Sequence, residues 1–115
     1  MQLEITNNAR EVTLSPADTD LIRGDMERLL DPLLASYPDD AAQLRVLISD
    51  ETRPSLVEVA LRLTLHGDLI RARETGPAFR PAFQQALREV RRQVLAHKDR
   101  HGRDHHLQQR EAEAP

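Results

Sequence analysis

Residues 79–101 read FRPAFQQALREVRRQVLAHKDRH and predict a long helix with one buried face. At about 100° per residue, five apolar side chains fall within one arc of roughly a quarter turn. This apolar seam consists of Phe79, Phe83, Leu87, Val90 and Val94. A neighbouring arc about a third of a turn wide holds basic side chains. They are Arg80, Arg88, Arg91, Arg92 and Lys98, and we expect this solvated stripe to suit a polyanion.

The sequence upstream of this helix predicts four strands and another helix. Apolar and polar residues alternate over 2–6, 43–49, 57–65 and 69–73, which is typical of strands with one buried face. The first helix should begin after Ser15, because Ser15 suits the N-cap, Pro16 the first helical position and Asp18 the capping-box position. It should kink or end near Asp31, because Pro32 lacks the N–H group that a helix requires.

The predicted element order is therefore β-α-β-β-β-α, an α+β fold. Each strand has one apolar face and each helix one apolar stripe, so we expect a four-stranded sheet with both helices packed on the same face. The passage from the first strand to the second is long enough for a parallel crossover, whereas the short loops at 50–55 and 66–68 require hairpins. We assign residues 1–101 to this domain and expect residues 102–115, which are polar with little to bury, to form a disordered tail.

Charge is segregated along the chain. The 115 residues carry a net charge of −3, yet residues 1–79 hold eight arginines against fourteen acids, whereas residues 80–106 hold seven basic residues against three acids. An acidic body that carries a basic helix favours a nucleic-acid partner, whereas the acidic net charge argues against broad, indiscriminate binding. The same helix could also be a solvated face without a ligand, because amphipathic helices with basic outer sides are common.

Composition excludes several other classes of protein. No cysteine is present, which removes disulfides and thiolate chemistry, and no apolar run approaches the roughly 18 residues of a membrane span. We expect a cytoplasmic, soluble protein that binds no membrane and no small-molecule substrate. No glycine-rich phosphate loop, nucleophile elbow or His-Glu metal helix occurs, so we predict neither catalysis nor a cofactor.

Three histidines offer a metal hypothesis that we weigh against a simpler one. His97, His101 and His105 follow one another at i, i+4 spacing, a geometry in which helical imidazoles can share a zinc ion. However, Gly102 should fray the helix between the second and third of them, and no carboxylate completes a known motif. We therefore interpret them as polar surface residues and predict no metal site.

The chain resembles the ribosome hibernation-promoting factors, also called sigma-factor modulation proteins. The resemblance covers about residues 1–100 and rests on the opening MQLEIT, the element order, and the run from Ile70-Arg-Ala-Arg-Glu-Thr-Gly76 through Phe83 to Lys98. It implies a protein without enzymatic activity that binds the small ribosomal subunit in the channel between head and body. There it would cover the tRNA and mRNA sites and inhibit translation during stress or stationary phase.

The resemblance also implies which residues contact ribosomal RNA. The family's basic last helix corresponds to Arg88, Arg91, Arg92 and Lys98, and its basic first helix to Arg23 and Arg28 only, because acids surround them here. Together with Arg80 these residues are the candidate RNA-binding set. The alternative is a diverged scaffold that binds a protein, or itself as a homodimer, through the open sheet face or the acidic first helix.

Overall fold

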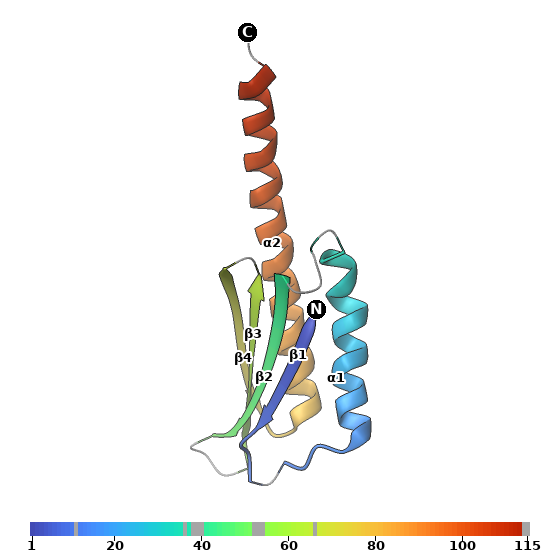
Figure 1. The fold of residues 1–115 in the computed structure, drawn as a ribbon. Coiled ribbons are helices and arrows are strands. Elements are labelled where there is room, and N and C mark those ends of the chain that lie inside the picture. The colour runs from blue at the N-terminus through green and yellow to red at the C-terminus, as the bar shows by residue number, and fades with distance from the viewer. Residues whose placement is uncertain (11, 36, 38–40, 52–54, 66, 114–115) are drawn as a thin grey trace.

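The computed structural model describes residues 1–10, 12–35, 37, 41–51, 55–65 and 67–113, with side chains described as far as Asp99. Figure 1 shows the elements in the predicted order β-α-β-β-β-α, with one additional short 3₁₀ helix, η1. Their bounds are β1 (Gln2–Asn7), α1 (Pro16–Leu29), η1 (Asp31–Leu33), β2 (Ala42–Asp50), β3 (Val57–Leu65), β4 (Asp68–Gly76) and α2 (Phe79–Glu113).

The four strands form one mixed sheet in the order β1-β2-β3-β4. β1 runs parallel to β2, as a crossover through α1 requires, and the hairpins β2-β3 and β3-β4 are antiparallel. The β3-β4 turn is tight, and Gly67 takes a φ of 83° there, in the left-handed region that suits glycine. β1 and β4 are therefore the two edges of the sheet.

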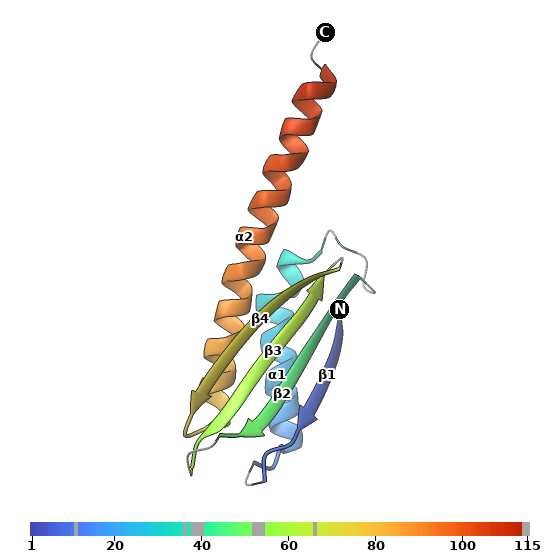
Figure 2. The same cartoon turned by 90° about the vertical axis from the view of Figure 1, so that its left-hand side faces the viewer.

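Both helices cover the same face of the sheet and leave the other face open (Figures 1 and 2). The core lies between these two layers and is almost entirely aliphatic, with Phe79 and Phe83 as its buried aromatic residues among the described side chains. Every residue of the predicted apolar seam is buried. The sequence prediction of an α+β fold with two helices on one face is confirmed.

The start and end of α1 follow from local chemistry. The Ser15 side chain accepts from the Asp18 backbone N–H, and the Asp18 carboxylate accepts from the Ser15 N–H, which completes the expected capping box. The helix ends at Leu29, and Pro32 then occupies the 3₁₀ turn η1, where its missing N–H costs nothing.

Two predicted boundaries are wrong. Helix α2 does not end at His101 but continues to Glu113, because one glycine inside a helix costs only about 1 kcal/mol and good helix formers follow Gly102. β4 continues to Gly76 because Thr75 and Gly76 pair with Glu58 and Val57. The division into a domain and a tail stays a prediction. In the part of the chain that the structure describes, no helix has the length and apolar character needed to cross a membrane.

Candidate nucleic-acid interface

The middle of α2 presents a cluster of three exposed arginines, Arg88, Arg91 and Arg92. Their i, i+3 and i, i+4 spacing places neighbouring Cβ atoms about 5–6 Å apart on one side of the helix. The apolar seam fixes the rotation of the helix about its axis, because Leu87, Val90 and Val94 have no exposed surface. The cluster therefore points away from the sheet, as the sequence predicted.

One member of this cluster has a carboxylate partner. Arg92 donates from Nη2 and Nε to the two oxygens of Glu89, at 2.6 and 3.0 Å. These hydrogen bonds, followed by one from Gln93, lower the pKa of Glu89 from 4.5 to about 2, and Glu89 in turn raises the pKa of Arg92. Within the described residues, Arg88 and Arg91 form no ion pair. The cluster thus retains two positive charges without a counterion among the residues that the structure describes.

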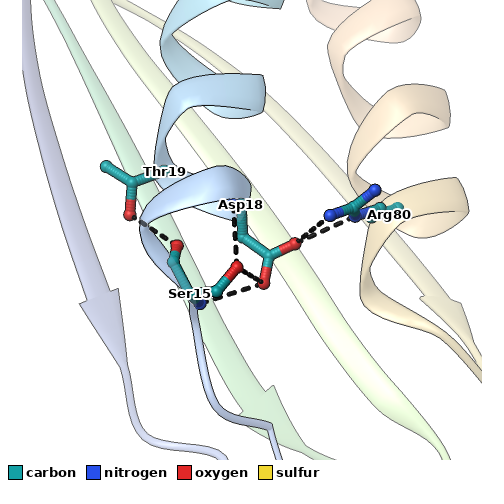
Figure 3. A network of polar contacts seen from close by, with 4 residues as sticks. All are labelled: Ser15, Asp18, Thr19 and Arg80. Atoms are coloured by element: carbon teal, nitrogen blue, oxygen red, sulfur yellow. Dashed lines mark hydrogen bonds and ion pairs between the residues drawn. The ribbon is translucent and has the colours of Figure 1, made fainter.

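Arg80 joins the N-termini of the two helices (Figure 3). Its Nε and Nη2 atoms donate to Asp18 Oδ1 at 2.9 and 2.8 Å, while the other oxygen of Asp18 takes part in the capping box with Ser15. The Ser15 N–H lowers the pKa of Asp18 most, and the Arg80 hydrogen bond adds to this effect. Arg80 is therefore positioned to stabilise helix packing, and its charge is balanced within the protein.

Lys98 makes a comparable contact at the other end of α1. Its Nζ atom donates to the backbone oxygen of Leu33 in η1 at 2.6 Å. The Asp18-Arg80 and Leu33-Lys98 contacts together show that α1 and α2 run side by side in the same direction, as Figure 1 also shows. The ammonium group of Lys98 thus satisfies a carbonyl group that the end of a helix leaves without a partner.

The two basic residues of α1 differ in their surroundings. Arg28 pairs with Asp25, whose side chain is buried. Arg23 is exposed, but it lies roughly 150° around α1 from Asp18 and Asp25 at about 100° per residue. Because Asp18 faces Arg80, Arg23 points to the flank away from α2. Arg23 therefore does not join the arginine cluster of α2, and Arg28 has its charge balanced by Asp25.

His97 lies in the interface between α2 and the sheet. It is 7% exposed, and its Nε2 atom is hydrogen-bonded to Asp68 Oδ2 at 2.8 Å. This contact joins α2 to the start of β4, so we interpret His97 as a structural residue. The side chains of His101 and His105 lie outside the described part. Within that part, no three His, Asp or Glu residues are grouped as metal ligands would be.

Sequence reasoning missed a second group of arginines, on the open face of the sheet. Arg45, Arg62 and Arg71 are exposed and stand directly opposite one another on β2, β3 and β4. The alternation had indicated that Arg62 faces solvent. The register between the strands was not predicted. The tight turn at 66–68 could have indicated the Arg62-Arg71 pair, because such a turn makes Leu65 and Asp68 partners.

The Glu89-Arg92 pair predicts how stability depends on pH. The pKa of Glu89 is lower in the folded protein, so the pair stabilises the fold above pH 4.5, and this contribution is lost as the pH falls toward about 2. We expect Glu89→Gln to lower the melting temperature at pH 7 and to have a much smaller effect near pH 2, as measured by circular dichroism. Glu27→Gln, at an exposed acid of α1, is the control. A deficit of Glu89→Gln that is equal at both pH values would contradict this assignment.

Comparisons with known proteins agree on one family and one fold. The family model described as sigma 54 modulation protein / S30EA ribosomal protein matches residues 5–102. A ribosomal subunit interface protein from Coxiella burnetii has a TM-score of 0.66 at 17% identity, covering 86% of this chain and 99% of its own. The Protein Y N-terminal domain of Thermus thermophilus has a TM-score of 0.63 at 21% identity, covering 82% and 96%. At these identities the two structures demonstrate a common fold. None of the curated proteins matches the chain.

Proposed function

Because its family model covers residues 5–102, the chain belongs to the sigma 54 modulation protein / S30EA ribosomal protein family, and we propose that it binds the small ribosomal subunit and inhibits translation. The arginine cluster on α2 supports this proposal most directly. Arg88 and Arg91 are exposed cations without an ion pair among the described residues, and Arg92 stands beside them. Each guanidinium can donate two parallel hydrogen bonds to a phosphate.

In this proposal, the protein occupies the channel between head and body of the subunit and excludes tRNA and mRNA by its volume. No bond is made or broken, so we assign the protein no catalytic role. Because it acts on the ribosome, we place its action in the cytoplasm. The acidic first helix has a function here as well. It would be repelled by RNA, so only the arginine-bearing surfaces can face ribosomal RNA, and the orientation of the protein in the channel is restricted.

The alternative of a protein-binding or self-associating module has less support. Among the described residues, the large apolar side chains that are exposed are Leu69 on β4 and Leu95 on α2, which are 48% and 38% exposed. A protein-protein interface would need a contiguous apolar centre. The open face of the sheet instead presents arginines in its middle.

Sedimentation with isolated small subunits at low, physiological and high salt tests the proposal. We expect saturable binding at physiological salt that weakens as salt rises. Each neutralised phosphate should contribute about −0.7 to −0.9 to the slope of log K against log salt concentration. Three phosphate contacts therefore predict a slope of roughly −2 to −3. Binding that is absent at physiological salt, or that does not saturate, would refute the proposal.

A further inference from the structure

A row of charged side chains crosses the open face of the sheet from one edge to the other. The register pairs Glu4 with Arg45, Arg45 with Arg62, and Arg62 with Arg71. The neighbours of these residues along each strand, such as Leu44, Leu61 and Ile70, are buried beneath the helices, so the row lies on the opposite face. Figure 2 turns this face toward the viewer, in front of α1 and α2.

Two arginines of the row have no negative partner in the described part of the chain. Arg45 is 3.4 Å from Glu4, and on the same face Arg73 is 3.2 Å from Glu58. Arg62 and Arg71 stand between these pairs, and neither forms an ion pair within the described residues. Directly opposite residues in neighbouring strands have Cβ atoms only about 4.5–5.5 Å apart. Two uncompensated guanidinium groups therefore lie beside each other.

This arrangement costs stability rather than adding it. Like charges directly opposite each other in a sheet repel, whereas uncharged side chains at the same positions would not. The next row on this face, Gln43, Thr64 and Leu69, is indeed uncharged. The fold therefore does not require arginine at positions 62 and 71, and an anion that bound between them would relieve the repulsion.

The chemistry of the face selects the kind of anion. Neighbouring strands are about 4.8 Å apart, so the Cα atoms of Arg45, Arg62 and Arg71 span roughly 10 Å. The exposed side chains described on this face include no aromatic ring. Phe79 and Phe83 are buried in the core, where they stack on each other with centroids 5.8 Å apart. Bases would find no platform for stacking here. The face is suited to the phosphates of a nucleic-acid backbone, independent of sequence.

At the β4 edge, hydrogen bonds link the open face to one member of the arginine cluster, Arg92. Gln93 donates from Nε2 to the backbone oxygen of Arg71 at 2.8 Å and to Glu89 Oε1 at 3.1 Å. Glu89 in turn binds Arg92. A continuous chain of hydrogen bonds therefore leads from Arg71 on the sheet to Arg92 on the helix. Arginines lie on both sides of this edge.

We propose that Arg62 and Arg71, with Arg45 beside them, form a second phosphate-binding surface, so that the protein contacts RNA with its open sheet face as well as with α2. The inference rests on the proposed function for the identity of the RNA as ribosomal. The phosphate-binding property of the face itself does not depend on the ribosome. With arginines on the open sheet face and on α2, the protein could contact two RNA segments at once.

The test compares the full-length wild type with the double variant Arg62→Gln/Arg71→Gln. Fluorescence anisotropy measures binding of labelled oligouridine over a salt series, and sedimentation measures binding to small subunits. Oligouridine serves as the probe because its bases stack weakly, so that phosphate contacts dominate. We expect the double variant to bind oligouridine several-fold more weakly, with a salt slope smaller by about 1.4, which corresponds to two single-strand phosphates.

Two further variants serve as controls, one that removes a charge elsewhere and one that keeps both charges of the row. Arg10→Gln removes a positive charge from the β1-α1 connection, outside the row, and it should bind oligouridine as the wild type does. Arg62→Lys/Arg71→Lys keeps both charges and should retain most of the salt slope. The melting temperature of the glutamine variant should be unchanged or higher, because the repulsion between the two arginines is removed.

The outcomes separate this inference from the proposed function. If Arg62→Gln/Arg71→Gln binds oligouridine as tightly as the wild type, or if the wild type fails to bind oligouridine even at low salt, the second surface is refuted. If the double variant loses oligouridine binding but the wild type never sediments with small subunits, the proposed function fails while the phosphate-binding face stands. Loss of both kinds of binding in the double variant supports both.

Discussion

The triple variant Arg88→Gln/Arg91→Gln/Arg92→Gln is expected to lose co-sedimentation with small ribosomal subunits at physiological salt. These residues form the exposed cluster of α2, and each glutamine removes a charge that could neutralise a phosphate. If each arginine contacts one phosphate, the salt slope falls in magnitude by about 2 to 3. The fold should persist, because surface substitutions usually change stability by no more than about 0.5 kcal/mol each, although loss of the Glu89-Arg92 pair should lower the melting temperature somewhat.

Arg80→Gln provides the matched control for this experiment. Arg80 belongs to the same basic stripe of α2, but its guanidinium is held by Asp18 in the first turn of α1. We expect Arg80→Gln to lower the melting temperature while binding to subunits is largely kept, whereas the triple variant should lose binding. Sedimentation of the triple variant at wild-type levels across the salt series would show that α2 does not face RNA.

Most of the fold could be predicted from the sequence, because its signals are local. Alternation defines each strand, the capping box at Ser15 defines the start of α1, and the apolar seam defines the buried side of α2. The end of α2 was missed because the effect of Gly102 was overestimated, and the end of β4 was missed because distant contacts decide it. β4 reaches Gly76 through its pairing with β3, and turn chemistry at Gly76-Pro77 could not reveal that pairing.

The candidate site was less predictable, because contacts between residues far apart in the sequence determine which of its side chains are paired. The sequence placed Arg80 and Lys98 in solvent beside Arg88 and Arg91, since position on a helical wheel was the available signal. Their partners, Asp18 and Leu33, lie 62 and 65 residues away, and the contacts exist only because the two helices pack side by side. The assignment of the candidate residues to RNA binding stays a prediction, with Arg88, Arg91 and Arg92 best exposed for it.

The largest effect on stability is expected at Phe83. Its ring is fully buried and stacks on Phe79, at an interplanar angle of 24°, where the apolar seam of α2 meets the sheet. Phe83→Ala should reduce the free energy of unfolding by about 3–5 kcal/mol, because a buried phenyl group is lost and a cavity remains. This is a large part of the roughly 5–15 kcal/mol that holds a typical domain together. Urea denaturation followed by circular dichroism measures the change.

Phe83→Leu should cost less than Phe83→Ala, because leucine fills most of the space left by the ring. The seam holds the arginine cluster in place but does not itself contact RNA. Subunit binding by Phe83→Ala should therefore decline only in proportion to its unfolded fraction, and cooling or a stabilising osmolyte should restore it. A stability loss below about 1 kcal/mol would contradict the burial of Phe83 between α2 and the sheet, because cavities of this kind cost more. Loss of binding in a fully folded Phe83→Ala protein would mean that the seam contributes more than support.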